Sequence, residues 1–132
     1  GALHHMDLDA AYKEAARLLR PDGKFFCLEA IRHNPIIHLY RRMTPHLRTA
    51  WEVDHILGRQ QVMKGLEYFN KIEKKHYFMF SILAVPFRNT ILFKPLLSVF
   101  RAADAVLTRL PIFQWLSWQC LFILSEPKGK QQ

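Results

Sequence analysis

The spacing of apolar and polar residues near the start of the chain predicts a helix followed by a strand. In residues 7–20, apolar side chains recur every three or four positions and charged side chains fill the gaps, which places the apolar residues on one helical face. Asp7 or Asp9 can cap the start of this helix. Residues 21–23, Pro-Asp-Gly, end it, because proline cannot continue a helix and glycine permits the turn.

Three segments have the composition of strands: residues 24–31, 76–85 and 118–125. The first holds four consecutive apolar residues, which is typical of a strand buried on both faces. A helix, a short turn and a buried strand together make half of a crossover unit in a parallel sheet. The sequence therefore predicts an α/β fold and raises the question of which strands flank residues 24–31.

Two further helices are expected between these strands. Residues 59–69 form a short one with Val62, Leu66 and Phe69 facing inward, and residues 95–110 form the clearest helix of the chain. In the latter, we expect Ser98, Arg101, Asp104 and Thr108 to face the solvent. The apolar stripe expected to face the core consists of Leu96, Val99, Phe100, Ala103, Val106, Leu107 and Leu110.

Composition and charge narrow the class of protein. A chain of 132 residues suits a single domain with its own core. The net charge of +8 favours an anionic partner, which leaves nucleic acid, an acidic membrane surface and a negatively charged substrate open. No recognised nucleic-acid motif accompanies this charge, so we expect no nucleic-acid partner.

The cysteines and the longest apolar run bear on the cellular location. Cys27 and Cys120 each lie inside an apolar run, which favours buried thiols in a reducing cytoplasm over a disulfide or a zinc site. Acidic residues interrupt any signal-like stretch at the start. The longest run without charge, residues 110–125, is too short and too polar to span a membrane. We therefore expect a cytoplasmic protein without a membrane span.

The run GALHHMDLDAAYKEAARLLRPDGKFFCLEA, residues 1–30, resembles the second half of a class I S-adenosylmethionine-dependent methyltransferase. In that family a strand ends in a Leu-His-His-like turn, and a helix then leads through a Pro-x-Gly turn into a strand that ends near an acidic residue. Residues 34–57 also resemble the cap and substrate region of bacterial members. The matching positions are Leu3-His4-His5, then Glu14, Arg17, Leu19, Pro21 and Gly23, and finally Glu29.

The resemblance implies the C-terminal half of a Rossmann-like methyltransferase sheet, with flanking helices. Its three strands would form a mixed sheet in which the last strand lies between the other two and antiparallel to them. Residues 1–132 would be one truncated domain, within which residues 32–58 form a cap of the substrate-binding type. The bare apolar edge of residues 24–31 would invite another chain, so we expect a homo-oligomer.

The cofactor implied by the resemblance is S-adenosylmethionine, but its binding loop is absent from the sequence. Such a cofactor normally needs closely spaced glycines after a first strand, so that the backbone can approach the ligand. The five glycines, at positions 1, 23, 58, 65 and 129, make no such loop. The family's glycine-rich strands would precede Gly1.

Residues at the first turn and at the end of the first strand are candidates for chemistry. By resemblance, Leu3 and His4 would contact the cofactor, and His5 and Glu29 would be catalytic. A histidine titrates near neutrality and can act as a base, while Glu29 ends a strand where ligands bind in open α/β sheets. The structural alternatives are exposed, inactive histidines and a Glu29 that pairs with Arg32 or Arg41.

Residues 30–51 favour an anionic ligand, because they contain four arginines and no acid. Arginine presents a planar, permanently charged group suited to a carboxylate or a phosphate. The alternative is that these arginines pair with nearby acids and fix a cap. The seven histidines lack the spacing of a metal site. The candidate substrate-binding residues are Arg32, Tyr40, Arg41, Arg42, Thr44 and Arg48.

Two functions of different classes follow. The first is the substrate-side portion of a methyltransferase acting on a small anionic or lipophilic acceptor, not catalytic as this chain alone. The second is a non-catalytic binding or assembly module for an anionic partner or for its own oligomer. A third interpretation has the helix at residues 95–110 resting on an acidic membrane, with Arg101 and Arg109 as its outward cations.

Overall fold

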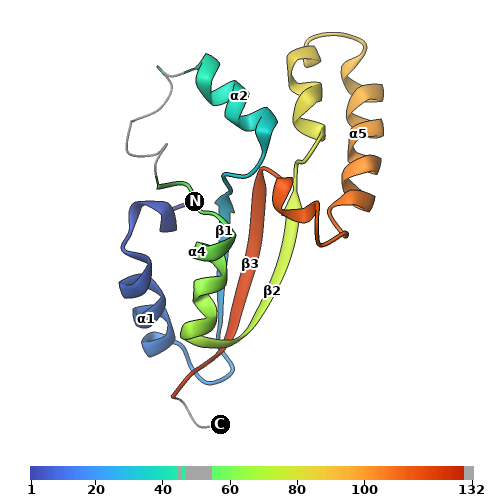
Figure 1. Cartoon of the computed structure of the whole chain (residues 1–132). Coiled ribbons are helices and arrows are strands. Elements are labelled where there is room, and N and C mark those ends of the chain that lie inside the picture. Colours follow the sequence, from blue (N-terminus) through green and yellow to red (C-terminus); the bar gives the residue numbers. More distant parts are fainter. Residues whose placement is uncertain (45, 47–54, 130–132) are drawn as a thin grey trace.

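The computed structural model describes residues 1–44, 46 and 55–129, and its elements form one antiparallel sheet with helices beside it and beyond one end (Figure 1). The helices are α1 (Leu8–Leu18), α2 (Pro35–Met43), α4 (Arg59–Met63) and α5 (Phe93–Leu107). Short 3-10 segments are η1 (Leu3–His5), η3 (Lys64–Glu67), η4 (Ser81–Phe87) and η5 (Gln114–Leu116). The strands are β1 (Lys24–Ala30), β2 (Phe69–Tyr77) and β3 (Gln119–Pro127).

The sheet has the order β1-β3-β2, with β3 antiparallel to both neighbours. The expectation that the last strand lies between the other two is therefore confirmed. The expected mixed sheet is not confirmed, because both described strand pairs are antiparallel. Since β1 and β2 each run against β3, their carboxyl ends meet at the same end of the sheet, beside α2, η4 and α5 (Figure 1).

One face of the sheet carries the core and the other is open. On the covered face, Cys27 of β1 lies opposite Phe122 of β3, and both are buried. On the open face, Phe26 is 62% exposed and Leu28 is 46% exposed. The prediction that residues 24–31 are buried on both faces is wrong, because the described elements cover only one. The fully buried members of the core include Tyr12 of α1, Val62 of α4, Phe69, Phe122 and Leu124.

The first helix and its turn form as the sequence predicts. Asp7 caps α1 by accepting a hydrogen bond from the Ala10 amide at 3.1 Å. After the helix, the Gly23 amide donates to the Arg20 carbonyl at 2.9 Å and closes the turn into β1. A Cβ at Gly23 would lie 2.9 Å from the side chain of Leu19, so glycine lets the turn pack against the helix end.

The second strand differs from the prediction of residues 76–85. β2 ends at Tyr77, and the following apolar residues form η4. The chain leaves the sheet at Phe78, whose φ of 60° lies in the left-handed region that a bulky side chain adopts at a cost. The Trp118 amide lies 3.1 Å from the carbonyls of both Tyr77 and Phe78, which holds this turn in place.

The inward and outward faces predicted for residues 95–110 are partly wrong. Asp104 is buried at 8% exposure, whereas Val99 and Val106 are 65% and 63% exposed. The reason lies in η4, because the amides at its start donate to the Asp104 carboxylate and turn this side of α5 inward. The expected assignment rested on polarity alone, and a carboxylate with several donors can be buried.

Among the described residues, none of the helices combines the length and the apolar character needed to cross a bilayer.

Candidate functional site

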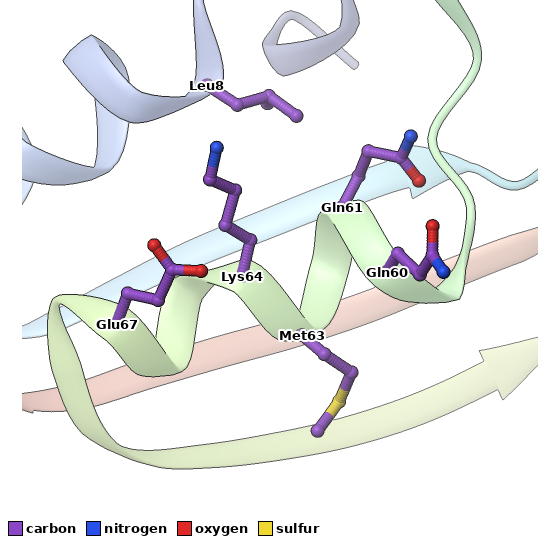
Figure 2. A pocket seen from close by; sticks show the side chains of 6 residues that line it. All are labelled: Leu8, Gln60, Gln61, Met63, Lys64 and Glu67. Atoms are coloured by element: carbon purple, nitrogen blue, oxygen red, sulfur yellow. The ribbon is translucent and has the colours of Figure 1, made fainter.

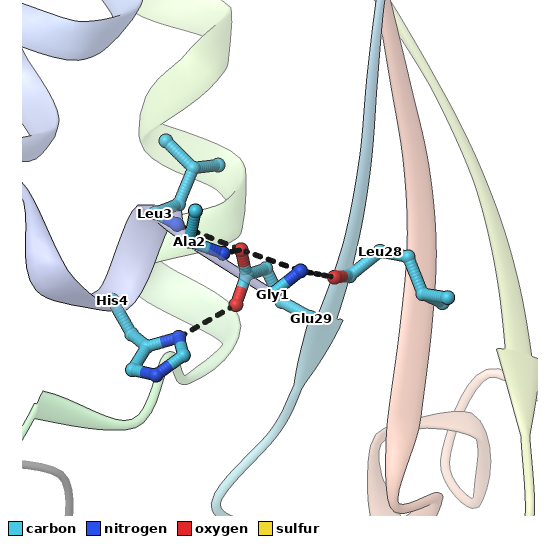
Figure 3. Close-up of polar contacts among 6 residues, drawn as sticks. All are labelled: Gly1, Ala2, Leu3, His4, Leu28 and Glu29. Atoms are coloured by element: carbon cyan, nitrogen blue, oxygen red, sulfur yellow. Dashed lines mark hydrogen bonds and ion pairs between the residues drawn. The ribbon is translucent and has the colours of Figure 1, made fainter.

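The residues predicted at the first turn and at the end of β1 come together around one carboxylate (Figure 3). Glu29 is 2% exposed, and its Oε1 accepts hydrogen bonds from the Ala2 and Leu3 amides at 2.8 Å each. Its Oε2 lies 2.9 Å from Nδ1 of His4. A carboxylate accepts hydrogen bonds, so Nδ1 of His4 is the donor and Nε2 is the ring nitrogen that remains for another partner.

These contacts make Glu29 the anchor of the turn. Since Glu29 lies near the end of β1 on the covered face, its carboxylate meets the amides of Ala2 and Leu3 and fixes the turn to the sheet. His5 is exposed, and its ring lies 4.0 Å from that of His4. Leu3, His4 and Glu29 are thus brought together, and the His5 ring lies tilted beside that of His4.

The space beside this turn is small. A pocket of about 140 Å³ is lined by Leu3 and His4 from the turn and by residues of α1 and α4. Pockets for small molecules usually measure ~300–1,000 Å³, so this one holds a fragment of a nucleoside cofactor at most. The other lining residues are Met6, Leu8, His55, Ile56 and Gln61.

The glycines do not supply a cofactor cradle either. A backbone that receives a dinucleotide or an adenosyl group needs glycines that open space for the ligand. Here the three inner glycines face side chains of the chain itself. Gly23 lies against Leu19, Gly58 against Arg32 and Gly65 against Leu124. The residues present therefore do not fit S-adenosylmethionine as a whole.

The predicted substrate residues are distributed along the cap segment and not around Glu29. Arg32 directly follows the bridge between Ile31 and Leu57, and its guanidinium donates to Oε1 of Gln61 at 3.4 Å. This hydrogen bond holds the start of α4, so Arg32 has a structural role in the cap segment. Glu29 is paired with the turn and not with Arg32.

The remaining predicted substrate residues belong to α2 and its end. Tyr40 and Arg42 are exposed on α2, Arg41 is partly buried, and Thr44 follows the helix and donates from Oγ to the Tyr40 carbonyl at 2.7 Å. Arg48 lies outside the described residues. The helix thus groups four of the predicted residues at one place.

The start of α2 is held firmly by a residue that the sequence did not single out. Asn34, 1% exposed, caps α2 by accepting from the Ile36 and Ile37 amides. Its Nδ2 donates to the carbonyls of Met79 and Leu116 at 3.2 and 2.7 Å. Asn34 therefore joins the cap helix to the segments that follow β2 and precede β3.

A second pocket, which sequence reasoning missed, lies where β2 passes into η4 and α5. Its volume is about 570 Å³, which is within the usual range for a small-molecule site. Tyr77 and Phe78 contribute partly exposed aromatic rings, and Arg101 contributes a cation. The other lining residues are His76, Ser81, Leu97, Asp104, Ala105 and Thr108.

His76 at this pocket is a buried, neutral histidine. Nδ1 lies 3.0 Å from the Ser117 hydroxyl, and the ring meets the edge of Trp115 at 5.0 Å between centroids. Burial and, to a smaller extent, the nearby Lys74 ammonium lower the pKa of His76 to about 4.

The cysteine next to His76 is not an activated nucleophile. Sγ of Cys120 lies 3.9 Å from Nε2 of His76. Burial raises the pKa of the Cys120 thiol to about 12, so the reactive thiolate is scarce at neutral pH. Cys27 is buried in the same way, with a pKa raised to about 12. The predicted burial of both thiols is confirmed.

A third pocket lies between the start of α1 and the α4–η3 segment (Figure 2). Its volume is about 530 Å³, yet none of its six lining side chains is buried. The Lys64 ammonium on its wall is paired with Asp9, to which the Tyr68 hydroxyl also donates at 2.8 Å. This pocket is therefore a groove between the helices, and the contacts of Asp9 with Lys64 and Tyr68 close it at the surface.

The part of the chain that the structure describes contains no group of three His, Cys, Asp or Glu side chains arranged to hold a metal ion. Comparisons with protein-family models, with curated proteins and with solved structures find no match to the chain.

Proposed function

We propose that this chain is the acceptor-side portion of an S-adenosylmethionine-dependent methyltransferase that acts on a small anionic or lipophilic acceptor. The observation that carries the proposal is the Leu3–His4 turn held on Glu29 at the carboxyl end of β1. By the resemblance of residues 1–30, this is where cofactor and acceptor meet. The position of β3 between β1 and β2 supports the same assignment.

The pocket at the end of β2 is suited to the acceptor. It opens at the same end of the sheet as Glu29, because β1 and β2 point the same way. Tyr77 and Phe78 provide an apolar wall, and Arg101 provides a charge for an anionic group. The role of these residues is to hold and orient the acceptor and to exclude water.

The cofactor contacts available here are those of Leu3 and His4 alone. The proposal therefore assigns the glycine-rich cradle to residues outside this chain, and the chain alone is not expected to catalyse. The buried free thiols of Cys27 and Cys120 support a reducing, cytoplasmic location.

The test begins with the gene. An in-frame segment before Gly1 that encodes a glycine-rich strand and turn supports the proposal, and a gene without one contradicts it. Calorimetric titration of the gene's full product with S-adenosylhomocysteine is then expected to show saturable binding, weakened by Glu29→Gln. The 132-residue chain alone is expected to give no heat of binding, and tight binding by it would contradict the division of roles.

The second candidate function is a non-catalytic assembly module that associates with its own copies or with an anionic partner. The observation that favours it is the open face and edge of β1, where Phe26 and Leu28 are exposed. The oligomeric state tests this candidate, because the assembly function requires that the chain associate with its own copies or with a partner.

A further inference from the structure

The segment from Phe78 to Phe113, here named the η4–α5 hairpin, exposes an apolar stripe on α5. Val99 and Val106 are seven residues apart and are 65% and 63% exposed. Leu92 and Leu110 continue the stripe at the two ends of the helix, at 50% and 45% exposure. Since residues seven apart lie on one face of a helix, the stripe follows the full length of α5.

Apolar side chains next to the helix extend this surface. Ile91, in the turn before α5, is 94% exposed, and Ile112, in the turn after it, is 83% exposed. Five more large apolar residues of the hairpin are exposed by more than a third: Phe78, Leu83, Val85, Phe87 and Phe113. Exposed apolar side chains of this number in one segment are typical of an interaction site.

The same hairpin has an unbalanced positive charge. Arg88, Lys94, Arg101 and Arg109 are all exposed, and none of them forms an ion pair with a described residue. The only acid in residues 78–125 is Asp104. Its carboxylate is buried and accepts hydrogen bonds from the start of η4, so the exposed charge of the hairpin is entirely positive.

Two of the cations lie near the stripe and two do not. Arg109 is three residues after Val106 and borders the stripe at the end of the helix, and Arg88 precedes Ile91 in the turn that leads into α5. Lys94 and Arg101 are seven residues apart and share a face next to the buried Asp104, which at about 100° per residue is turned away from the stripe. A helix with an apolar face bordered by cations is the arrangement that lies in the interface plane of an anionic bilayer.

We propose that the η4–α5 hairpin docks on an anionic lipid surface. The apolar stripe enters the boundary between headgroups and acyl chains, and Arg88 and Arg109 contact the lipid phosphates. No described helix can cross a bilayer, so the helix lies along the surface. A second copy of the chain is disfavoured as the occupant, because the exposed charge of the hairpin is entirely positive in both copies.

The test is co-sedimentation of the 132-residue chain with vesicles of phosphatidylcholine, with and without phosphatidylglycerol. We expect binding to the mixed vesicles, weakened by salt because exposed charges are screened. A cation near an anionic surface contributes about fivefold to binding. The double variant Arg88→Gln/Arg109→Gln is therefore expected to bind about 25-fold more weakly.

A second variant tests the stripe itself. Val99→Gln/Val106→Gln keeps good helix formers at exposed positions and is expected to bind the mixed vesicles about tenfold more weakly. Leu18→Gln is the matched control, because Leu18 is 66% exposed on α1, outside the hairpin; its binding is expected to stay unchanged. Far-UV circular dichroism verifies that each variant folds.

Three results would overturn the proposal. Equal binding to vesicles with and without phosphatidylglycerol would show that the cations do not recognise the lipid charge. Unchanged binding by Val99→Gln/Val106→Gln would show that the stripe does not enter the lipid. Light scattering that finds a dimer for the natural chain and a monomer for this variant would show that a second copy covers the stripe.

Discussion

At the residue scale, Glu29 holds a carboxylate almost entirely out of water with three donors around it. Glu29→Gln replaces one acceptor oxygen by an amide group that donates, and so leaves one of these donors without a partner. A buried donor without a partner costs about 1–3 kcal/mol. We expect a loss of stability of this size, measured by urea unfolding.

The control for Glu29 is Glu14→Gln. Glu14 pairs with Arg17 on the surface of α1, where an ion pair contributes little. The urea midpoint of the Glu14→Gln variant is expected to stay near that of the natural chain. If both substitutions shift the midpoint equally, Glu29 is not the anchor of the turn.

His76 is expected to make stability depend on pH. Its pKa of about 4 in the folded chain lies below the ordinary value of 6.5, because burial disfavours the charged ring. The unfolded chain therefore binds more protons between these two values, and stability is lost as the pH falls from 6.5 towards 4. The slope from one such group is at most about 1.4 kcal/mol per pH unit.

The measurement compares urea midpoints at several pH values for the natural chain and for His76→Gln. Glutamine can still contact the Ser117 hydroxyl and does not titrate, so the variant is expected to lose less stability on acidification. His5→Gln, at an exposed position, is the control and is expected to follow the natural chain. Parallel pH profiles for all three would contradict the assignment to His76.

Single-residue predictions succeeded where the deciding contact is local. Asp7 caps α1 through an amide three residues away, and such a contact can be inferred from the sequence. The burial of Asp104 could not, because its donors lie 23 to 25 residues earlier in the chain. Polarity alone places an aspartate in solvent unless the donors that meet it are known.

At the element scale, the hydrogen bonds that Asp104 accepts at the start of η4 hold η4 and α5 together in the η4–α5 hairpin. The Met79, Phe80 and Ser81 amides donate to its carboxylate at 3.1, 2.7 and 3.2 Å, and the Ser81 hydroxyl donates at 2.6 Å. Asp104→Asn removes the charge and one acceptor from these donors. We expect a loss of about 2 kcal/mol.

Hydrogen exchange locates this effect. Amides of residues 79–81 and of α5 are expected to exchange faster in Asp104→Asn, while those of β1 and β3 keep their protection. Ser98→Ala, at an exposed position of α5, is the control. Uniform loss of protection throughout the chain would show that Asp104 supports the whole fold and not the hairpin.

The predicted elements were correct in kind except around β2, which spans Phe69–Tyr77 and not residues 76–85. The apolar run of residues 77–85 reads as a continued strand, yet a short apolar run has no period that separates a strand from a helical segment. The deciding event is the left-handed backbone of Phe78, which no neighbouring residue type signals. The pocket at the end of β2 was missed for the same reason, because it forms at this turn.

At the scale of the whole molecule, the open face and edge of β1 predict self-association. The Gly1 amine donates to the Leu28 carbonyl, which therefore faces away from β3. Backbone groups alternate along a strand, so the Phe26 carbonyl faces the same free edge. Phe26 is also 62% exposed. We expect light scattering at micromolar concentration to give at least twice the mass of one chain.

The variant that tests this association is Phe26→Lys, because a lysine on an edge strand opposes pairing with another chain. Met43→Lys is the matched control, since Met43 is 72% exposed on α2. We expect Phe26→Lys alone to be monomeric. A natural chain that is already monomeric would contradict both the expected oligomer and the assembly function.

The arrangement of the candidate site was predictable only in part. Leu3, His4 and Glu29 come together because a turn and a strand end, both visible in the sequence, meet at one end of the sheet. Arg32 instead contacts Gln61, next to the bridge between Ile31 and Leu57. No local sequence pattern predicts that bridge. Contacts across the cap segment depend on how distant segments meet.

The position of β3 also determines when the sheet can form during synthesis. Lys24 pairs with Ser125, and Lys71 pairs with the same residue. Neither outer strand can therefore form its strand pairing before β3 has been synthesised. Pairings over such sequence separations form slowly, and β1 and β2 leave the ribosome with unpaired edges. The nascent chain is therefore most open to aggregation, and most dependent on chaperones, until its final strand emerges.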